Sequence, residues 1–116
     1  MYKVKFNNRL KYGNIHAEYK GGRFHSKKEC RKAMELDLMK KGKVIKDWKA
    51  QHKLSLDVNG VHIANYFCDF MVTHLDGHIE YLEIKSYITK TPVWRIKWKL
   101  SQAIYDDPTI EWTVEV

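Results

Sequence analysis

The chain has 116 residues, enough for one domain with a modest hydrophobic core. It has no apolar run of about 18 residues that could span a membrane, no secretion leader, and too few cysteines for a disulfide framework. The formal net charge of +7 is uneven, since residues 1–53 hold 16 Lys and Arg against 5 Asp and Glu, whereas residues 54–116 hold 5 against 9. We therefore expect a protein of a reducing cytoplasm, and the charge fits either a polyanionic partner or a solvated basic surface.

The N-terminal part predicts short strands. Residues 1–11 form a basic segment that fits either a strand or an arm that orders on DNA. Residues 15–19 and 23–25 flank Lys20-Gly21-Gly22, a pattern typical of a tight turn. A small hairpin is therefore expected before the first helix.

The first helix is predicted for residues 26–41, and Gly42 fits the left-handed position that closes a helix. Apolar residues at spacings of three and four predict its buried stripe, which consists of Cys30, Ala33, Met34 and Leu38. Ser26-x-x-Glu29 matches a capping box, in which the Glu29 side chain reaches back to the Ser26 amide.

The rest of the chain predicts a sheet and a second helix. Strands are expected at residues 44–51, 54–58, 61–72, 79–85 and 110–116, with a two-residue turn at Asn59-Gly60. Thr91 and Pro92 fit the N-cap and first position of a helix over residues 93–105. The predicted fold class is α/β, a mixed central sheet flanked by two helices.

The segment between Asp69 and Lys85 is the most informative part of the chain. Alternating residues flank a three-residue loop whose last position, Gly77, suits a left-handed conformation. With that loop, Asp69 lies opposite Glu83 at a Cβ separation of about 4.5–5.5 Å, and Lys85 follows on the same face. Two carboxylates at this spacing can share one hard cation, whereas an exposed ion pair across the strands is the alternative explanation.

The pattern Asp69…Glu83-Ile84-Lys85 resembles the PD-(D/E)XK nuclease superfamily, although Cys68 stands where Pro is usual. The resemblance implies a restriction-endonuclease-like core. Asp69, Glu83 and the backbone carbonyl of Ile84 would hold Mg²⁺ or Mn²⁺, which would offset charge on the phosphate and acidify a water molecule. Lys85 would orient or deprotonate the attacking water, or stabilise the developing negative charge.

Other segments extend the resemblance over roughly residues 12–116. Ser26-Lys27-Lys28-Glu29, Gln51-His52-Lys53 and residues 96–100 are similar to a small phage-encoded group of these nucleases. The order of the acidic residues is also similar to that of the phage endonuclease I type of Holliday junction resolvase. This similarity implies that Glu29 is catalytic or a further metal ligand, in competition with its capping role. It also implies branched DNA, a bacterial host cytoplasm, and a homodimer for symmetric cutting.

Polar and basic residues near the expected site suit contacts with DNA phosphates. These residues are Gln51, Lys53, Arg95, Lys97 and Lys99. The three on the second helix also fit a solvated face, with Ile96 and Leu100 packing inward. Gln51 would touch the phosphate or the attacking water, or would simply end a strand. Trp94 and Trp98 could stack on bases, but a helical aromatic pair more often packs in a core.

Histidine and cysteine suggest no additional site. His74-x-x-x-His78 straddles the tight loop, Cys68 is the only nearby cysteine, and a fourth ligand is missing, so structural zinc is not expected. Cys30 and Cys68 fit interior positions, and the chain has no glycine-rich phosphate loop.

The sequence thus predicts a metal-dependent endonuclease that hydrolyses phosphodiester bonds in DNA, with selectivity for branched DNA implied by the resemblance. The alternative is a non-catalytic nucleic-acid-binding or accessory module on the same fold. An RNA substrate is also compatible with the sequence.

Overall fold

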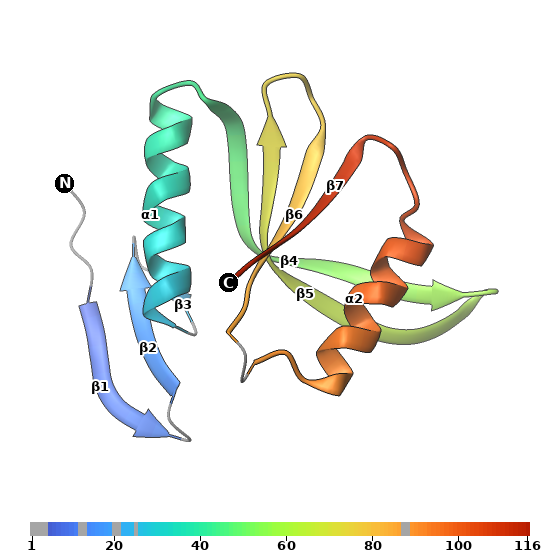
Figure 1. Cartoon of the computed structure of the whole chain (residues 1–116), viewed down its shortest axis with the longest axis horizontal. Helices are drawn as coiled ribbons and strands as arrows, with labels where there is room; N and C mark the ends of the chain where they lie inside the picture. Colours follow the sequence, from blue (N-terminus) through green and yellow to red (C-terminus); the bar gives the residue numbers. More distant parts are fainter. Residues whose placement is uncertain (1–4, 12–13, 20–21, 25, 87–88) are drawn as a thin grey trace.

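The computed structural model describes residues 5–11, 14–19, 22–24, 26–86 and 89–116, with side chains from Ser26 onward. Figure 1 shows two sheets and two helices within these ranges. The small sheet consists of β1 (Lys5–Lys11), β2 (Asn14–Tyr19) and β3 (Gly22–Phe24). The main sheet consists of β4 (Ile45–Val58), β5 (Val61–His74), β6 (Ile79–Ile84) and β7 (Ile110–Glu115). The helices are α1 (Lys27–Lys41) and α2 (Pro92–Ile104).

The small sheet confirms the predicted N-terminal hairpin. β2 pairs antiparallel with β3, and Tyr19 lies opposite Gly22. β1 pairs antiparallel with β2, so residues 5–11 form a strand. Residues 1–4, Lys20, Gly21 and His25, which the sequence predictions also covered, lie outside the described residues.

The main sheet is mixed, which confirms the α/β class with two helices. Its strand order is β4-β5-β6-β7, with antiparallel pairing between the first three strands and parallel pairing of β6 with β7. The prediction of two separate strands before Asn59 is wrong, because His52 and Lys53, which were expected to separate them, pair with Cys68 and Phe67 within one continuous β4. Asn59 and Gly60 have φ angles of 52° and 79°, as a primed two-residue turn requires.

β4 and β5 are long enough to serve two hydrophobic cores. In Figure 1 they bend near the middle of the molecule, and one arm runs beside α1 while the other runs beside α2. Phe70, Leu82 and Ile84 pack with α1 in the first core. Tyr66 and Tyr81 belong to the second core, against which α2 and β7 pack. The middle of β5 and the end of β6 therefore lie where the two cores meet.

The buried stripe of α1 differs from the prediction. Cys30 and Ala33 are buried as expected, but Leu38 is 68% exposed, and Leu36 and Asp37 are buried instead. Asp37 lies one helical turn beyond Ala33, and its carboxylate pairs with the Lys41 ammonium at 3.4 Å. The helix therefore places an ion-paired carboxylate where the apolar pattern predicted Leu38.

Two predictions about helix ends and faces are also wrong. α1 ends at Lys41 and Gly42 caps it, as predicted, but Gly42 has φ −78° and the left-handed residue is Lys43, with φ 58°. On α2, Leu100 packs against the second core, but Ile96 is 65% exposed. Ile96 is two residues from Trp98, which packs on the core, so it lies on the opposite side of the helix. The predicted cap is confirmed, because the Thr91 hydroxyl accepts a hydrogen bond from the Trp94 amide at 3.1 Å.

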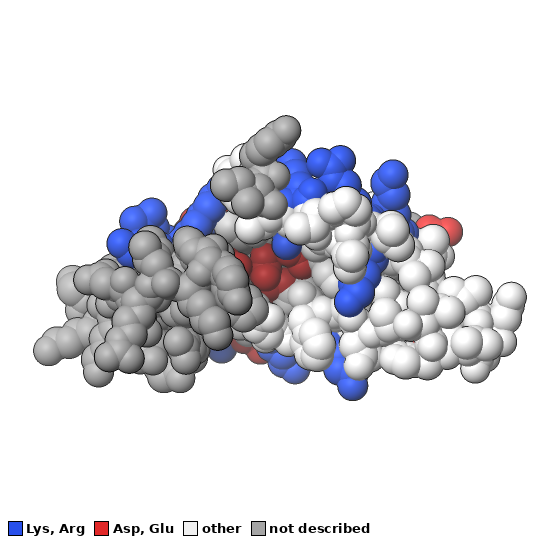
Figure 2. Space-filling view, turned by 90° about the horizontal axis from the view of Figure 1, so that it is seen from below, with Lys and Arg blue, Asp and Glu red and all other residues white. Residues whose placement is uncertain are grey.

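The surface has a hollow floored by acidic side chains. Figure 2 shows these side chains recessed in the middle of one face, with Lys and Arg side chains above and below them. Among the described residues, no helix is both long and apolar enough to cross a membrane.

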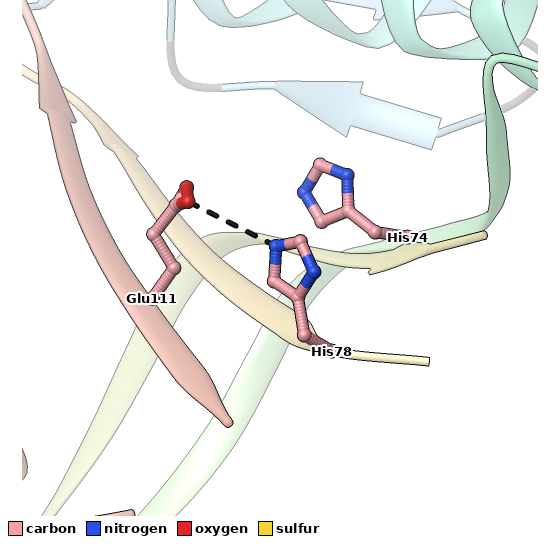
Figure 3. A group of neighbouring side chains, drawn as sticks. All are labelled: His74, His78 and Glu111. Atoms are coloured by element: carbon pink, nitrogen blue, oxygen red, sulfur yellow. Dashed lines mark ion pairs between the residues drawn. The ribbon is translucent and has the colours of Figure 1, made fainter. Parts of the chain in front are cut away.

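The loop between β5 and β6 has the predicted three-residue form. Gly77 has φ 93°, and its amide donates a hydrogen bond to the His74 carbonyl at 3.0 Å. The loop places His74 and His78 side by side, near Glu111 of β7 (Figure 3).

Candidate functional site

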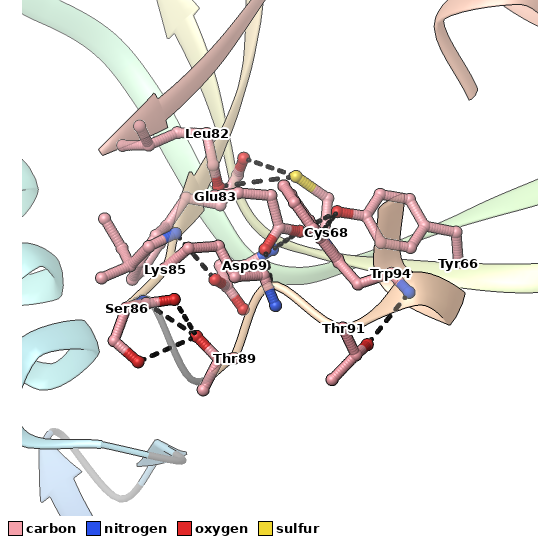
Figure 4. A network of polar contacts seen from close by, with 12 residues as sticks. Tyr66, Cys68, Asp69, Leu82, Glu83, Lys85, Ser86, Thr89, Thr91 and Trp94 are labelled. Carbon is pink, nitrogen blue, oxygen red and sulfur yellow. Dashed lines mark hydrogen bonds and ion pairs between the residues drawn. The ribbon is translucent and has the colours of Figure 1, made fainter. Parts of the chain in front are cut away.

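The register of β5 and β6 brings the predicted carboxylates together. The last ladder pair is Phe70 with Leu82, so Asp69 and Glu83 occupy the next position along the two strands. At this position, hydrogen bonds from backbone amides to side chains take the place of backbone pairing. The Asp69 amide donates to Glu83 Oε1 at 3.2 Å, and the Ile84 amide donates to Asp69 Oδ2 at 2.9 Å (Figure 4). The two residues thus lie opposite each other, as the hairpin geometry predicted, and each carboxylate is fixed by a backbone amide of the opposite strand.

Both carboxylates are removed from water. Asp69 is 7% exposed and Glu83 is 1% exposed. Leu82 and Ile84 pack in the first core, so the alternation of β6 turns Glu83 toward the second core. Burial raises the pKa of Glu83 to about 8, and the charge of Asp69 and a hydrogen bond with it act in the same direction. The pair therefore needs a proton or a cation to offset its charge.

Lys85 supplies one positive charge at this position. Its Nζ lies 3.7 Å from Glu83 Oε2 and 4.9 Å from the centre of the Trp94 ring. The ammonium is therefore held between a carboxylate and an aromatic face, and both attract a cation. Asp69, Glu83 and Lys85 form one cluster, as the sequence predicted.

Tyr66 and Trp94 complete this cluster, although the sequence predicted no role for Tyr66 and favoured core packing over base stacking for Trp94. The Tyr66 hydroxyl donates a hydrogen bond to Glu83 Oε1, and Trp94 Nε1 donates to the Tyr66 oxygen at 3.1 Å (Figure 4). Burial raises the pKa of Tyr66, and the Glu83 charge raises it further, so the phenol stays protonated and able to donate. Trp94 also packs on the core, as expected of the Trp94–Trp98 pair, whose rings stack at 5.7 Å.

Gln51 lies beside the carboxylates in the sheet. The pairs Ala50 with Phe70 and His52 with Cys68 flank it, so the register places it across from Asp69. Its φ angle is 53°, a conformation that costs a non-glycine residue about 1–3 kcal/mol when it is held at a functional site. Gln51, Asp69 and Glu83 consequently occupy one row across three strands.

Glu29 is only partly explained by the capping box. The Ser26 hydroxyl accepts a hydrogen bond from the Glu29 amide at 3.1 Å, which is half of that motif. The Glu29 side chain is buried at 7% exposure. Among the described residues, however, Glu29 does not form a group with Asp69 and Glu83 in which all ligand atoms lie within 4.8 Å of one another. The structure therefore shows the serine half of the capping box, and a metal-binding role for Glu29 stays a prediction.

The predicted DNA-binding residues are spread around the site. Arg95 follows Trp94 and is exposed, and its Nε donates to the Lys90 carbonyl at 3.2 Å. Lys97 is directed toward β5, where its Nζ donates to the Asn65 carbonyl at 3.1 Å. Lys99 is exposed on α2, and Lys53 is exposed on β4 two residues beyond Gln51. Of these, Arg95 and Gln51 adjoin the residues of the cluster in sequence or register.

The cluster suits a hard divalent cation. Asp69 and Glu83 provide carboxylate oxygens, the ligand type that Mg²⁺ and Mn²⁺ prefer. Burial raises the pKa of Glu83 most, and the charge of Asp69 raises it further, whereas the charge of Lys85 lowers it. When both carboxylates are ionised, the single ammonium of Lys85 leaves one negative charge in the cluster without an opposite charge. A divalent cation at the two carboxylates would offset it.

The profile of a protein family described as "Protein of unknown function (DUF1064)" matches residues 9–116, so the chain belongs to this family. Comparison with curated proteins and with solved structures gives no match.

Proposed function

We propose that the protein is a metal-dependent endonuclease with a restriction-endonuclease-like core that hydrolyses phosphodiester bonds in DNA. One observation carries the proposal: two buried carboxylates and a lysine meet where β5 and β6 diverge, and each carboxylate accepts a hydrogen bond from the opposite backbone. A structural ion pair needs one acid and one base. The additional buried carboxylate is costly unless it takes up a proton or binds a cation, and two oxygen ligands beside a lysine suit a cation.

The roles of the residues follow from their contacts. Asp69 and Glu83 would hold Mg²⁺ or Mn²⁺, with the backbone carbonyl of Ile84 as a third ligand. The bound metal would supply charge neutralisation and a more acidic water molecule. Lys85 places a positive charge next to the carboxylates, where it would stabilise the anionic phosphate. Tyr66 and Trp94 would fix the orientation of Glu83 and Lys85.

The surroundings of the site favour a polyanionic substrate. The N-terminal half carries most of the basic residues. Lys and Arg side chains lie above and below the acidic hollow on one face (Figure 2). Arg95 on α2 and Gln51 on β4 are the residues we propose for contact with the scissile phosphate or the attacking water. A branched substrate and a homodimer that cuts it symmetrically complete the proposal.

The test uses purified protein with labelled four-way junction, linear duplex and single-stranded DNA, each with Mg²⁺, Mn²⁺ or EDTA. We expect metal-dependent cutting that falls at least 100-fold in Asp69→Asn and in Glu83→Gln. A fall of this size is expected when a carboxylate that binds the metal is removed. Asp106→Asn is the matched control, because Asp106 is an exposed carboxylate after α2, and this variant should cut like the parent.

The outcomes separate the alternatives. Equal cutting of all three substrates would support the nuclease activity and contradict the preference for junctions. Salt-sensitive binding without cutting under either metal would favour a non-catalytic nucleic-acid-binding module. Unchanged cutting by Asp69→Asn would show that the site lies elsewhere.

A further inference from the structure

A second group of metal-binding side chains lies at the other end of the β5–β6 hairpin. One ligand atom each from His74, His78 and Glu111 lies within 4.8 Å of the other two (Figure 3). His74 ends β5, His78 follows the loop, and Glu111 lies on β7. The sequence predicts that the tight loop prevents His74 and His78 from binding one metal ion together. In the structure the loop instead stacks the two imidazole rings at 4.0 Å, with an angle of 8° between their planes.

Asp76 orients His78 for metal binding. The Nδ1 of His78 lies 2.6 Å from Asp76 Oδ1, which also accepts a hydrogen bond from the His78 amide at 2.9 Å. A carboxylate at Nδ1 fixes the tautomer that leaves Nε2 as a lone-pair donor. That Nε2 lies 3.8 Å from Glu111 Oε1. A carboxylate on one ring nitrogen and a second ligand opposite the other is the usual arrangement of a metal-binding histidine.

His74 has an equivalent partner. Its Nε2 lies 2.8 Å from Glu80 Oε1, on the strand that follows the loop. Glu80 can therefore hold the His74 ring as Asp76 holds the His78 ring, which leaves Nδ1 of His74 for a metal ion. The two imidazoles are not buried, since their side chains are 25% and 31% exposed.

An open depression next to His78 gives solvent access to the group. It is lined by Asp76, Gly77, His78, Pro108 and Thr109. Glu111 is half-exposed. A metal ion here could therefore keep a water molecule in a fourth position.

We propose that His74, His78 and Glu111 form a site for one transition-metal ion of the Zn²⁺ class, with water as the fourth ligand. Two imidazoles and one carboxylate suit Zn²⁺, whereas Mg²⁺ prefers oxygen ligands throughout. The site is separate from Asp69 and Glu83, because five residue steps along β5 separate Asp69 from His74, a rise of roughly 17 Å. The ion would join the β5–β6 loop to β7 and so fasten the parallel edge of the sheet.

The structure also supplies a matched control. His62 Nδ1 lies 2.6 Å from Asp57 Oδ1, so it has the same carboxylate pairing as His78. His62 is exposed on the other long hairpin, and among the described residues it belongs to no three-donor group. If the His78–Asp76 contact were only a histidine–carboxylate pair, the two histidines would behave alike toward metal.

The test is competition between the untagged full chain and a chromophoric Zn²⁺ chelator, with millimolar Mg²⁺ present to occupy the carboxylate site. We expect one tightly bound Zn²⁺ per chain. Affinity should fall at least 100-fold in His74→Ala and in His78→Ala, and 10- to 100-fold in Asp76→Asn. His62→Ala and Asp69→Asn should bind Zn²⁺ like the parent.

A second measurement distinguishes loss of the metal site from misfolding of a variant. Zn²⁺ should raise the Tm of the parent by several degrees, and Glu111→Gln, a half-exposed substitution, should keep the parent Tm in EDTA but lose most of that rise. No stoichiometric Zn²⁺ binding, or equal losses in His62→Ala and His78→Ala, would overturn the proposal. Loss of DNA cutting in Asp69→Asn with Zn²⁺ binding retained would confirm that the two sites are independent.

Discussion

At the scale of single residues, Tyr66 is the side chain on which the carboxylate cluster depends most closely. Its hydroxyl lies between Trp94 and Glu83, donating to the carboxylate and accepting from the indole. It is also the hydrogen-bond donor that lowers the pKa of Glu83 against the effect of burial. Tyr66 thus favours the ionised, metal-binding form of Glu83.

We expect Tyr66→Phe to destabilise the protein by about 1–3 kcal/mol, because a buried carboxylate loses a donor. We also expect it to weaken Mg²⁺-dependent cutting at least tenfold, with the larger loss at low pH, where protons compete for Glu83. Urea denaturation and cutting rates as a function of Mg²⁺ concentration measure the two effects.

Tyr105→Phe is the control, because the Tyr105 hydroxyl donates to the Ser55 carbonyl at 2.7 Å on the second core, away from the carboxylates. It should lose about 1 kcal/mol of stability and retain the parent's Mg²⁺ dependence. If the two variants showed the same metal dependence, Tyr66 would be only a packing residue.

At the scale of elements, β4 contains one residue whose backbone conformation differs from that of an ordinary strand. Gln51 is left-handed within a strand whose pairing continues on both sides. Lys43, with φ 58°, has a similar conformation in the turn after α1. The two positions therefore allow the backbone cost to be separated from the side-chain role.

We expect Gln51→Gly and Lys43→Gly each to keep stability within about 1 kcal/mol of the parent, since relief of the left-handed strain offsets the greater freedom of the unfolded chain. Cutting should fall at least tenfold only in Gln51→Gly, because that variant removes the amide beside Asp69. Urea denaturation and the junction-cutting assay measure both quantities. Parent-like cutting by Gln51→Gly would assign the conformation of Gln51 to the bend of β4 alone.

Turn and cap residues predicted the ends of helices and strands well where the contact that sets the end involves only a few neighbouring residues. Gly77 set the loop and hence the register that joins Asp69 with Glu83, and Asn59-Gly60 set the other turn. Thr91 caps α2 through its own hydroxyl. In each case the deciding contact lies within about four residues, so the sequence contains it.

The sequence failed where the deciding partner is distant. Leu38 fits the apolar period of α1, but packing of the helix against Phe70 and Leu82 buries Leu36 and leaves Leu38 68% exposed. Tyr66 contacts Glu83 across 17 positions of the chain, and no motif links them. No sequence spacing links Glu111 with His74 and His78, because only the pairing of β6 with β7 brings that carboxylate near them.

At the scale of the whole molecule, the carboxylate cluster connects stability to pH. In the folded protein Glu83 binds a proton up to a pH of about 8, whereas its ordinary pKa is 4.5. Between these values the folded state holds more protons than the unfolded state, so the free energy of unfolding decreases as pH rises. The stabilising contribution is complete below about pH 4.5 and is lost as pH passes through about 8.

We therefore expect stability in EDTA to fall from pH 5 to pH 8 more steeply for the parent than for Glu83→Gln, which cannot titrate. Urea denaturation at each pH gives both profiles, and their difference isolates Glu83 from the histidines. Added Mg²⁺ should stabilise the parent most at the high end of this range. Parallel profiles for the two proteins would contradict the raised pKa.

The parallel edge of the main sheet has a consequence for the order of folding. The hairpins β4–β5 and β5–β6 join residues that are close in sequence, whereas Ile79 of β6 pairs with Ile110 of β7 across the whole of α2. Because closing a long loop is slower than closing a hairpin, we infer that β7 docks last. Until it docks, β6 is an edge strand with an open row of backbone groups. Because Glu83 of β6 pairs with Val114 of β7, one residue of the carboxylate cluster then gains its strand partner only in this last step.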